Sequence, residues 1–205
     1  AGNVPALVRP PSNSYDHISR VLDVGADGLI MPMVSSKDEV KHIISCMKYP
    51  PLGKRGVALG IAHDRYKKGK TANVLDESNR RTALAVLIET KEGVAKIDEI
   101  AAVNGVDCLW IGHFDLSCSL GVNGQFEHPA FVKAVNKVRK SAIKYNRALG
   151  QLVDDAKSGL AFFKKGFDVI CYSGDLWVYQ EALKNGVNDI KVGSEKLSLK
   201  KGIKK

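Results

Sequence analysis

The chain has 205 residues, of which 44% are hydrophobic and 26% are charged, a composition typical of a globular protein with one sizeable core. No apolar run approaches the roughly 20 residues that span a bilayer, and no basic segment followed by an apolar one opens the chain. Neither a membrane anchor nor a secretion signal is therefore indicated, and a cytoplasmic location is expected. We expect one α/β domain over residues 1–190 and a basic tail over residues 191–205.

The formal net charge of +9 raises the question of nucleic-acid binding. Much of the excess lies in residues 65–70 and in the lysines of residues 191–205. No aromatic residues alternate with the lysines of the tail, and no zinc-finger, RNP or KH signature is present. Specific nucleic-acid binding is therefore not expected, although a weak, salt-dependent attraction for polyanions is.

The chain opens with a short strand, a helix and a second strand. Residues 5–8 form an apolar run that ends in Arg9, and Ser14 can cap a helix with apolar residues on one face that ends at Gly25. Residues 28–33 are a second apolar run, which predicts a buried strand.

A second helix and a long connection follow. Ser35 or Ser36 can cap this helix, which must end before the prolines at positions 50 and 51. Residues 52–80 show no strong periodicity and are expected to form a long functional loop or lid.

Two neighbouring strands with an acid after each are the most informative feature of the sequence. Residues 83–88 and 106–111 are short, rich in β-branched residues and separated by a helical segment, which is typical of a βαβ unit. Glu89 directly follows the first run, and Asp115 stands just past the second, after Gly112. Both carboxylates should therefore emerge at the C-terminal edge of a parallel sheet, where α/β barrels carry their chemistry.

The remainder of the chain continues the alternation of helices and strands. The expected elements are a helix at 129–145, a strand at 148–153, a helix at 155–165, a strand at 168–171 and a helix at about 176–183. Six strands, near residues 6, 29, 85, 109, 150 and 170, predict an all-parallel α/β architecture with right-handed crossovers. Because a closed barrel needs eight strands, either the sheet is open or two βα units are absent from this sequence.

Several segments in chain order resemble the HpcH/HpaI family of metal-dependent pyruvate aldolases, which includes 2-dehydro-3-deoxyglucarate aldolase and 4-hydroxy-2-oxoheptanedioate aldolase. The resemblance runs from Val8 to about Val178 through VRPPSNSYDHISRVLDVGADGLIMPMV, KYPPLGKRGVA, LIETKEG, GVDCLWIGHFDLSCSLG and FEHP. It implies a (β/α)8 TIM barrel of the phosphoenolpyruvate/pyruvate type, of which this chain begins at the third strand, with the first two βα units missing. It also implies a homo-oligomer, a dimer or a hexamer, in which the last helix is often exchanged.

The resemblance further implies a carbon–carbon lyase that reversibly cleaves a 4-hydroxy-2-oxo acid into pyruvate and an aldehyde. Glu89 and Asp115 match the family's ligands for a divalent ion, Mg²⁺ or Mn²⁺ with Co²⁺ as a further candidate, which stabilises the pyruvate enolate. Arg9 matches the arginine that contacts the keto oxygen, and the backbone around Phe114 and Asp115 is expected to bind the pyruvate carboxylate. Asp23 matches an acid that supports the basicity of a catalytic histidine, which belongs to the first or second strand and thus lies outside this sequence.

Two departures from the family pattern concern the pocket. Leu87 stands where many relatives have a glutamine that contacts pyruvate, and His113 with Phe114 replaces a more usual proline and alanine. A Schiff-base mechanism is not expected, because the interiors of the predicted strands contain no lysine.

Each functional assignment has a structural alternative. An acid after a strand is often the N-cap of the next helix, Arg9 alone can pair with a surface carboxylate, and Asp23 can have a helix-end role. The same site could also decarboxylate oxaloacetate or perform a citrate-forming condensation, or the chain could be a non-catalytic homologue that binds metal or pyruvate without turnover.

Overall fold

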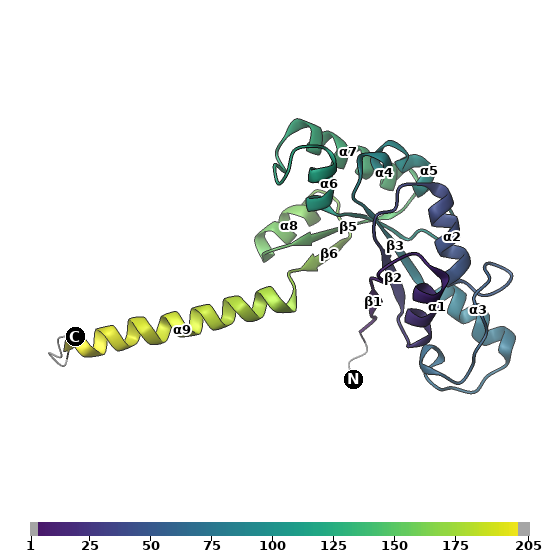
Figure 1. Ribbon diagram of the computed structural model, residues 1–205, viewed down its shortest axis with the longest axis horizontal. Helices are drawn as coiled ribbons and strands as arrows, with labels where there is room; N and C mark the ends of the chain where they lie inside the picture. The colour runs from purple at the N-terminus through teal and green to yellow at the C-terminus, as the bar shows by residue number, and fades with distance from the viewer. Residues whose placement is uncertain (1–3, 201–205) are drawn as a thin grey trace.

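The computed structural model describes residues 4–200, in which six parallel strands form one curled sheet (Figure 1). The strands are β1 (Leu7–Val8), β2 (Gly28–Met31), β3 (Ala83–Ile88), β4 (Cys108–Ile111), β5 (Ala148–Val153) and β6 (Val169–Tyr172). Each strand pairs with the next one along the chain. A doubly wound open sheet reverses its strand order at a switch point, whereas this sheet has the sequential order of an α/β barrel wall.

Helices cover one face of this sheet. They are α1 (Tyr15–Asp23), α2 (Lys37–Met47), the 3₁₀ helix η1 (Ala62–Asp64), α3 (Thr71–Arg81), α4 (Lys91–Ala95), α5 (Ile97–Ala101), α6 (His113–Ser119), α7 (Pro129–Lys144) and α8 (Ala156–Lys164). The last helix, α9 (Asp175–Lys200), does not cover the sheet (Figure 1). The predicted caps are confirmed: the Ser14 side chain accepts from the N–H of His17, and Ser36 forms a capping box with Glu39.

The main hydrophobic core lies between the sheet and its helices. Alternate strand residues such as Leu84, Val86 and Ile88 of β3 point into it, and Leu109 and Ile111 of β4 join them. A second, smaller cluster occupies the other face of the sheet and consists of Ala85, Leu87, Cys108 and Trp110. Both faces of β3 and β4 are thus apolar, which explains why their sequences read as unbroken apolar runs.

The long loop predicted at residues 52–80 is in part wrong, because its second half contains α3. The buried face of this helix carries Ser78 and Asn79 rather than apolar residues. The Asn79 amide accepts from the backbone N–H of Tyr49 at 2.7 Å and donates to the carbonyl of Tyr49 at 3.2 Å. Since polar contacts anchor this helix, it has no apolar periodicity for the sequence to reveal.

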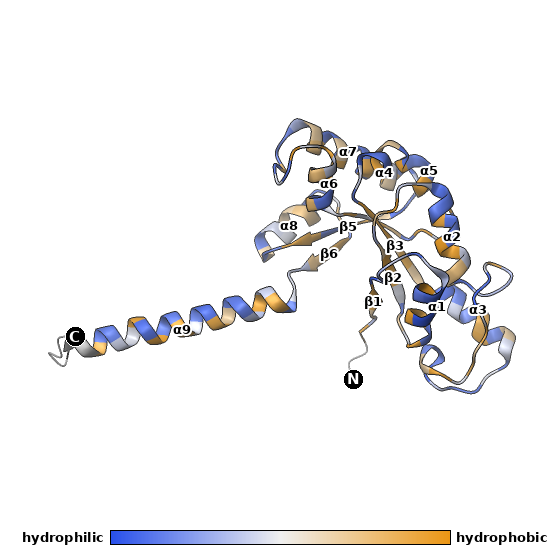
Figure 2. Ribbon diagram, viewed as in Figure 1, coloured by the Kyte–Doolittle hydropathy of each residue, from blue (hydrophilic) through white to orange (hydrophobic). Residues whose placement is uncertain are grey.

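The last helix was expected to end near residue 183, but α9 continues to Lys200 and includes residues 191–200 of the predicted basic tail. Residues 201–205 of that tail lie outside the described residues. The helix projects away from the sheet, and apolar residues recur along its length (Figures 1 and 2). Its mixed composition fits the finding that no described helix is long and apolar enough to cross a membrane.

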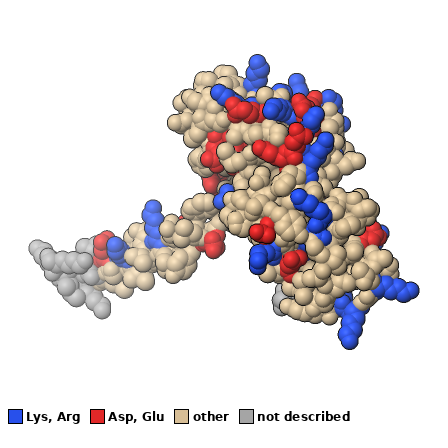
Figure 3. Space-filling model, turned by 45° about the vertical axis from the view of Figure 1, so that its right-hand side comes forward, with Lys and Arg blue, Asp and Glu red and all other residues tan. Residues whose placement is uncertain are grey.

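Basic and acidic side chains are interspersed over one face of the molecule (Figure 3). Among the described residues they form five ion pairs, four of them between partly or largely exposed side chains. The basic side chains on this face are therefore mixed with acidic ones, as in an ordinary solvated surface.

Candidate active site

Glu89 is a buried carboxylate at the C-terminal end of β3, with only 5% of the residue exposed. Its Oε2 accepts a hydrogen bond of 2.7 Å from the backbone N–H of Met33, which follows β2. Met33 has a left-handed backbone with a φ of 57°, which is uncommon for a residue with a side chain. The ends of β2 and β3 are thus linked through this carboxylate.

Gly112 makes room for Glu89. A Cβ atom at position 112 would overlap with Cγ and Oε1 of Glu89 and lie 2.9 Å from its Cδ. Only a glycine at the end of β4 therefore lets the glutamate lie between the ends of the two strands.

The charges of Asp115 and Arg9 both change the pKa of the Glu89 carboxylate. The pKa of Glu89 is raised, mainly by burial; the Met33 N–H lowers it, the neighbouring Asp115 carboxylate raises it, and the Arg9 guanidinium lowers it. Arg9 directly follows β1, and Asp115 lies in the first turn of α6, after β4. The structure therefore brings together Arg9, Glu89 and Asp115 at the C-terminal edge of the sheet.

The alternative of helix capping does not apply to either acid. Thr90 is the N-cap of α4 and accepts from the N–H of Gly93 at 3.0 Å. Gly112 occupies the N-cap position of α6, where no side chain makes a capping bond. Two adjacent carboxylates without a capping role repel each other, which is the arrangement that a bound cation relieves.

The donor set suits a divalent ion held by few protein ligands. The described residues contain no group of three or more His, Cys, Asp and Glu side chains that could hold a metal ion. Mg²⁺ is commonly bound by one or two carboxylates, with water and substrate oxygens in its other positions. Glu89 and Asp115 therefore fit such an ion.

The ring of Phe114 belongs to an aromatic cluster next to the site. Phe114 is 58% exposed as a residue, and its ring packs edge-on against that of Phe126, with their centroids 5.3 Å apart. The N–H groups of Phe114 and Asp115 lie in the first turn of α6, ahead of Leu116, which donates to the Gly112 carbonyl at 2.9 Å. Amides of a first turn have no acceptor within their helix and are available to an anion.

His113 belongs to the packing beside the site. Its Nδ1 accepts from Nε2 of Gln151 at 2.9 Å, and burial lowers its pKa, while Asp154 and Asp115 raise it. The ring is therefore neutral at pH 7 and carries its proton on Nε2.

Asp23 is not brought to this edge. It ends α1, which runs back from the C-terminal edge toward the start of the strands, and its Oδ1 accepts from Nη2 of Arg55 at 2.6 Å and from Nε at 3.2 Å. Arg55 lies near the start of β3. Its N–H donates to the carbonyl of Lys48, and the Lys48 ammonium donates to the carbonyl of Thr82, the residue directly before β3. β3 is six residues and about 20 Å long, so within this chain Asp23 is too far from Glu89 to act with it.

Sequence reasoning missed Met33 and Gly112. The apolar residue Met33 contributes only its backbone N–H, so its identity carried no signal. Gly112 did carry one, since a glycine directly after a buried strand and before a helix often marks a close approach.

The sequence can be compared with those of known protein families. The sequence pattern described as HpcH/HpaI aldolase/citrate lyase matches residues 1–181. The chain belongs to this family. This protein is thus an enzyme, a carbon–carbon lyase of the aldol type.

Individual relatives agree with this assignment. This chain is 32% identical over 176 residues to 5-keto-4-deoxy-D-glucarate aldolase of Shigella boydii. The match covers 86% of this chain and 68% of that protein. The chain is 35% identical to the HpcH/HpaI aldolase from Desulfitobacterium hafniense, with a TM-score of 0.86 over 92% of this chain and 73% of the other. An HpcH/HpaI aldolase/citrate lyase family protein from Burkholderia cenocepacia is 28% identical, with a TM-score of 0.83 over 90% and 73% of the two chains.

Proposed function

We propose that this protein reversibly cleaves a 4-hydroxy-2-oxo acid, such as 2-dehydro-3-deoxyglucarate or 4-hydroxy-2-oxoheptanedioate, into pyruvate and an aldehyde. The observation that supports it best is the pair of carboxylates, Glu89 and Asp115, beside Arg9 at the C-terminal edge of the sheet. A divalent ion held by this pair, Mg²⁺ or Mn²⁺ with Co²⁺ as a further candidate, supplies positive charge that stabilises the enolate of pyruvate.

The residues around the pair have separate roles in this proposal. Arg9 is exposed, and its guanidinium can donate to the keto oxygen of pyruvate as negative charge develops there. The first-turn amides of Phe114 and Asp115 receive the carboxylate of pyruvate. Met33 and Gly112 hold Glu89 in place.

The proton that moves during cleavage needs a base, and His113 is unsuited to this role. Its Nδ1 is already occupied by the amide of Gln151, and its Nε2 carries the proton. We therefore do not assign the base to His113.

The test is proton NMR of pyruvate in deuterated buffer with this chain and Mg²⁺. We expect loss of the methyl signal through exchange if the chain supplies a base, or metal-dependent broadening of that signal through binding alone if it does not. Either effect should disappear with a chelator and in Glu89→Gln. The control Glu92→Gln, an exposed acid in the first turn of α4, should behave as the unmodified chain.

Two outcomes would contradict the proposal. Pyruvate that neither binds nor exchanges in the presence of Mg²⁺ would exclude the site, and equal effects of Glu89→Gln and Glu92→Gln would exclude Glu89 as its ligand. A panel of acceptors with pyruvate, and oxaloacetate alone, would separate aldol cleavage from citrate-forming condensation and from decarboxylation.

We also propose that the protein works as a homo-oligomer, a dimer or a hexamer, in the cytoplasm. The exposed apolar residues of α9 support the first statement. The four cysteines of the sequence, which are all free thiols, support the second.

A further inference from the structure

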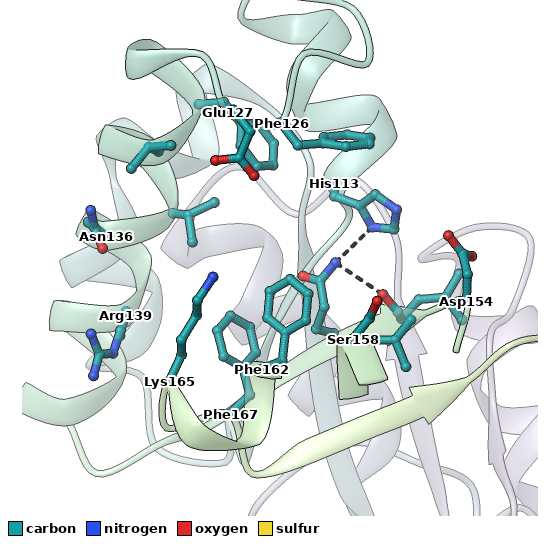
Figure 4. A pocket seen from close by; sticks show the side chains of 16 residues that line it. His113, Phe126, Glu127, Asn136, Arg139, Asp154, Ser158, Phe162, Lys165 and Phe167 are labelled. Atoms are coloured by element: carbon teal, nitrogen blue, oxygen red, sulfur yellow. Dashed lines mark hydrogen bonds between the residues drawn. The ribbon is translucent and has the colours of Figure 1, made fainter. Parts of the chain in front are cut away.

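A cavity of about 540 Å³ lies between α7 and α8, beside the end of β5 (Figure 4). Its apolar lining includes the rings of Phe131, Phe162 and Phe167 and the side chain of Val135. A volume of this size is within the range of small-molecule sites, roughly 300–1,000 Å³. Arg9, Glu89, Phe114 and Asp115 do not line it, so it is distinct from the carboxylate pair.

Gln151 places a polar group in this otherwise apolar wall. It lies on the helix side of β5 between Leu149 and Val153, which are core residues, and only 4% of it is exposed. Its Nε2 donates to Nδ1 of His113 at 2.9 Å and to the carbonyl of Leu152 at 3.2 Å. Both N–H bonds of the amide are thus used, and its Oε1, which has no partner in residues 4–200, remains as an acceptor for an occupant of the cavity.

Two cations lie on one side of the cavity. Arg139 of α7 and Lys165, which follows α8, both line it, and neither belongs to an ion pair among the described residues. Figure 4 shows them on the side opposite Asp154, which lies near His113. The Lys165 ammonium is 5.4 Å from the centre of the Phe162 ring, so charge and aromatic surface adjoin.

The acids of the lining limit the charge that an occupant can carry. Glu127 reaches into the cavity from the segment before α7, and Asp154 follows β5 (Figure 4). A ligand with one negative charge can meet Arg139 and Lys165 without approaching Asp154. A second negative charge at its far end would face that acid.

We propose that this cavity binds a small aromatic monocarboxylate that carries a hydroxyl group. The carboxylate lies at Arg139 and Lys165, the ring packs against the phenylalanine side chains, and the hydroxyl donates to Oε1 of Gln151. The carboxylate, the ring and the hydroxyl each match a different part of the cavity wall, and together they define one class of ligand. The site does not depend on the function proposed for the carboxylate pair.

The first test compares four probes by calorimetry with the full 205-residue chain. 4-Hydroxybenzoate should bind best. Benzoate lacks the hydroxyl, 4-hydroxybenzyl alcohol lacks the charge, and terephthalate carries a second carboxylate in place of the hydroxyl. Each change should weaken binding by roughly three- to tenfold, as expected for one lost charge-assisted or buried hydrogen bond.

The second test assigns the binding to this cavity. Lys165→Gln and Arg139→Gln should each weaken 4-hydroxybenzoate binding by roughly three- to tenfold, because each removes a charge-assisted contact. Lys164→Gln and Lys140→Gln remove neighbouring exposed charges that do not line the cavity and should leave binding unchanged.

A third variant isolates the acceptor. Gln151→Leu continues the apolar row of β5 and should abolish the preference for 4-hydroxybenzoate over benzoate while both still bind. Intermolecular NOEs from the probe ring to the rings of Phe162 and Phe167 should be seen with the unmodified chain. Absence of binding, equal affinity for all four probes, or equal effects of the cavity variants and their controls would overturn the proposal.

Discussion

Glu89 combines burial with a charge, and this combination lowers the stability of the folded protein. The Glu89 carboxylate is removed from water and lies near Asp115. The backbone N–H of Met33 donates one hydrogen bond to it. Its pKa is raised above the ordinary value of 4.5, with burial as the main cause. Such a perturbed carboxyl group at a strand end is typical of a functional site.

The sign of the effect on stability follows from proton binding. Because the pKa is higher in the folded chain, the folded state binds more protons than the unfolded state above pH 4.5, and stability falls as pH rises through the raised pKa. In chelator, Glu89→Gln should therefore increase the free energy of unfolding at pH 7. Urea unfolding at pH 4.5 and pH 7 measures this change, with Glu92→Gln as the exposed control.

A less stable Glu89→Gln protein at pH 7 would contradict this account. It would mean that the hydrogen bond between the charged carboxylate and Met33 outweighs the cost of burial. If the prediction holds, the charged carboxylate at the edge of the sheet makes the chain less stable than it could be at this position.

At the scale of elements, the pair of Asp23 and Arg55 joins α1 to the segment that follows α2. The Arg55 side chain is only 2% exposed, whereas that of Asp23 is 34% exposed. Arg55 also lies over the ring of Tyr49, with its guanidinium carbon 4.6 Å from the ring centre. A buried guanidinium that loses its carboxylate partner keeps the cost of burial without the compensating charge.

We therefore expect Asp23→Asn to lower the free energy of unfolding by roughly 1–3 kcal/mol. Asp76→Asn, which breaks the exposed pair with Arg80, should change it by less than about 0.5 kcal/mol. Urea unfolding of the two variants measures both effects. An Asp23→Asn protein of unchanged stability that no longer acts on pyruvate would instead support the catalytic role suggested by resemblance.

The elements that the sequence predicts well are those defined by local signals. Ser14 and Ser36 cap the first two helices through bonds to residues three positions away, so short segments contain the whole signal. α3 escaped prediction because Asn79 anchors it through the backbone of Tyr49, 30 residues earlier. Local patterns do not encode such contacts.

The same distinction applies to the site. Glu89 and Asp115 were predicted as neighbours because each follows a strand of one parallel sheet, and in the structure the Asp115 carboxylate is near enough to raise the pKa of Glu89. The contact from Met33 and the space left by Gly112 depend on how three strand ends meet. Residue types alone do not determine that arrangement.

At the scale of the whole molecule, α9 stands out because many of its apolar residues are exposed to solvent. It projects from the sheet as a helix of 26 residues, about 39 Å long, with apolar residues along it (Figures 1 and 2). Leu176, Leu183, Ile190 and Leu197 recur every seven residues, and each is more than half exposed. A seven-residue repeat places them along one side of the helix, as in helices that pack against other helices.

We propose that a second copy of the chain covers this row, in line with the proposed homo-oligomer. The double variant Leu183→Lys with Ile190→Lys places two charges in the row and should shift the mass in solution toward the 22.3 kDa of one chain. Asn185→Lys with Asn188→Lys adds the same charges away from the row and should leave association unchanged. Light scattering after size exclusion, over a range of concentrations, measures all three proteins. If the unmodified chain has the mass of one copy throughout, or both double variants act alike, α9 does not mediate self-association.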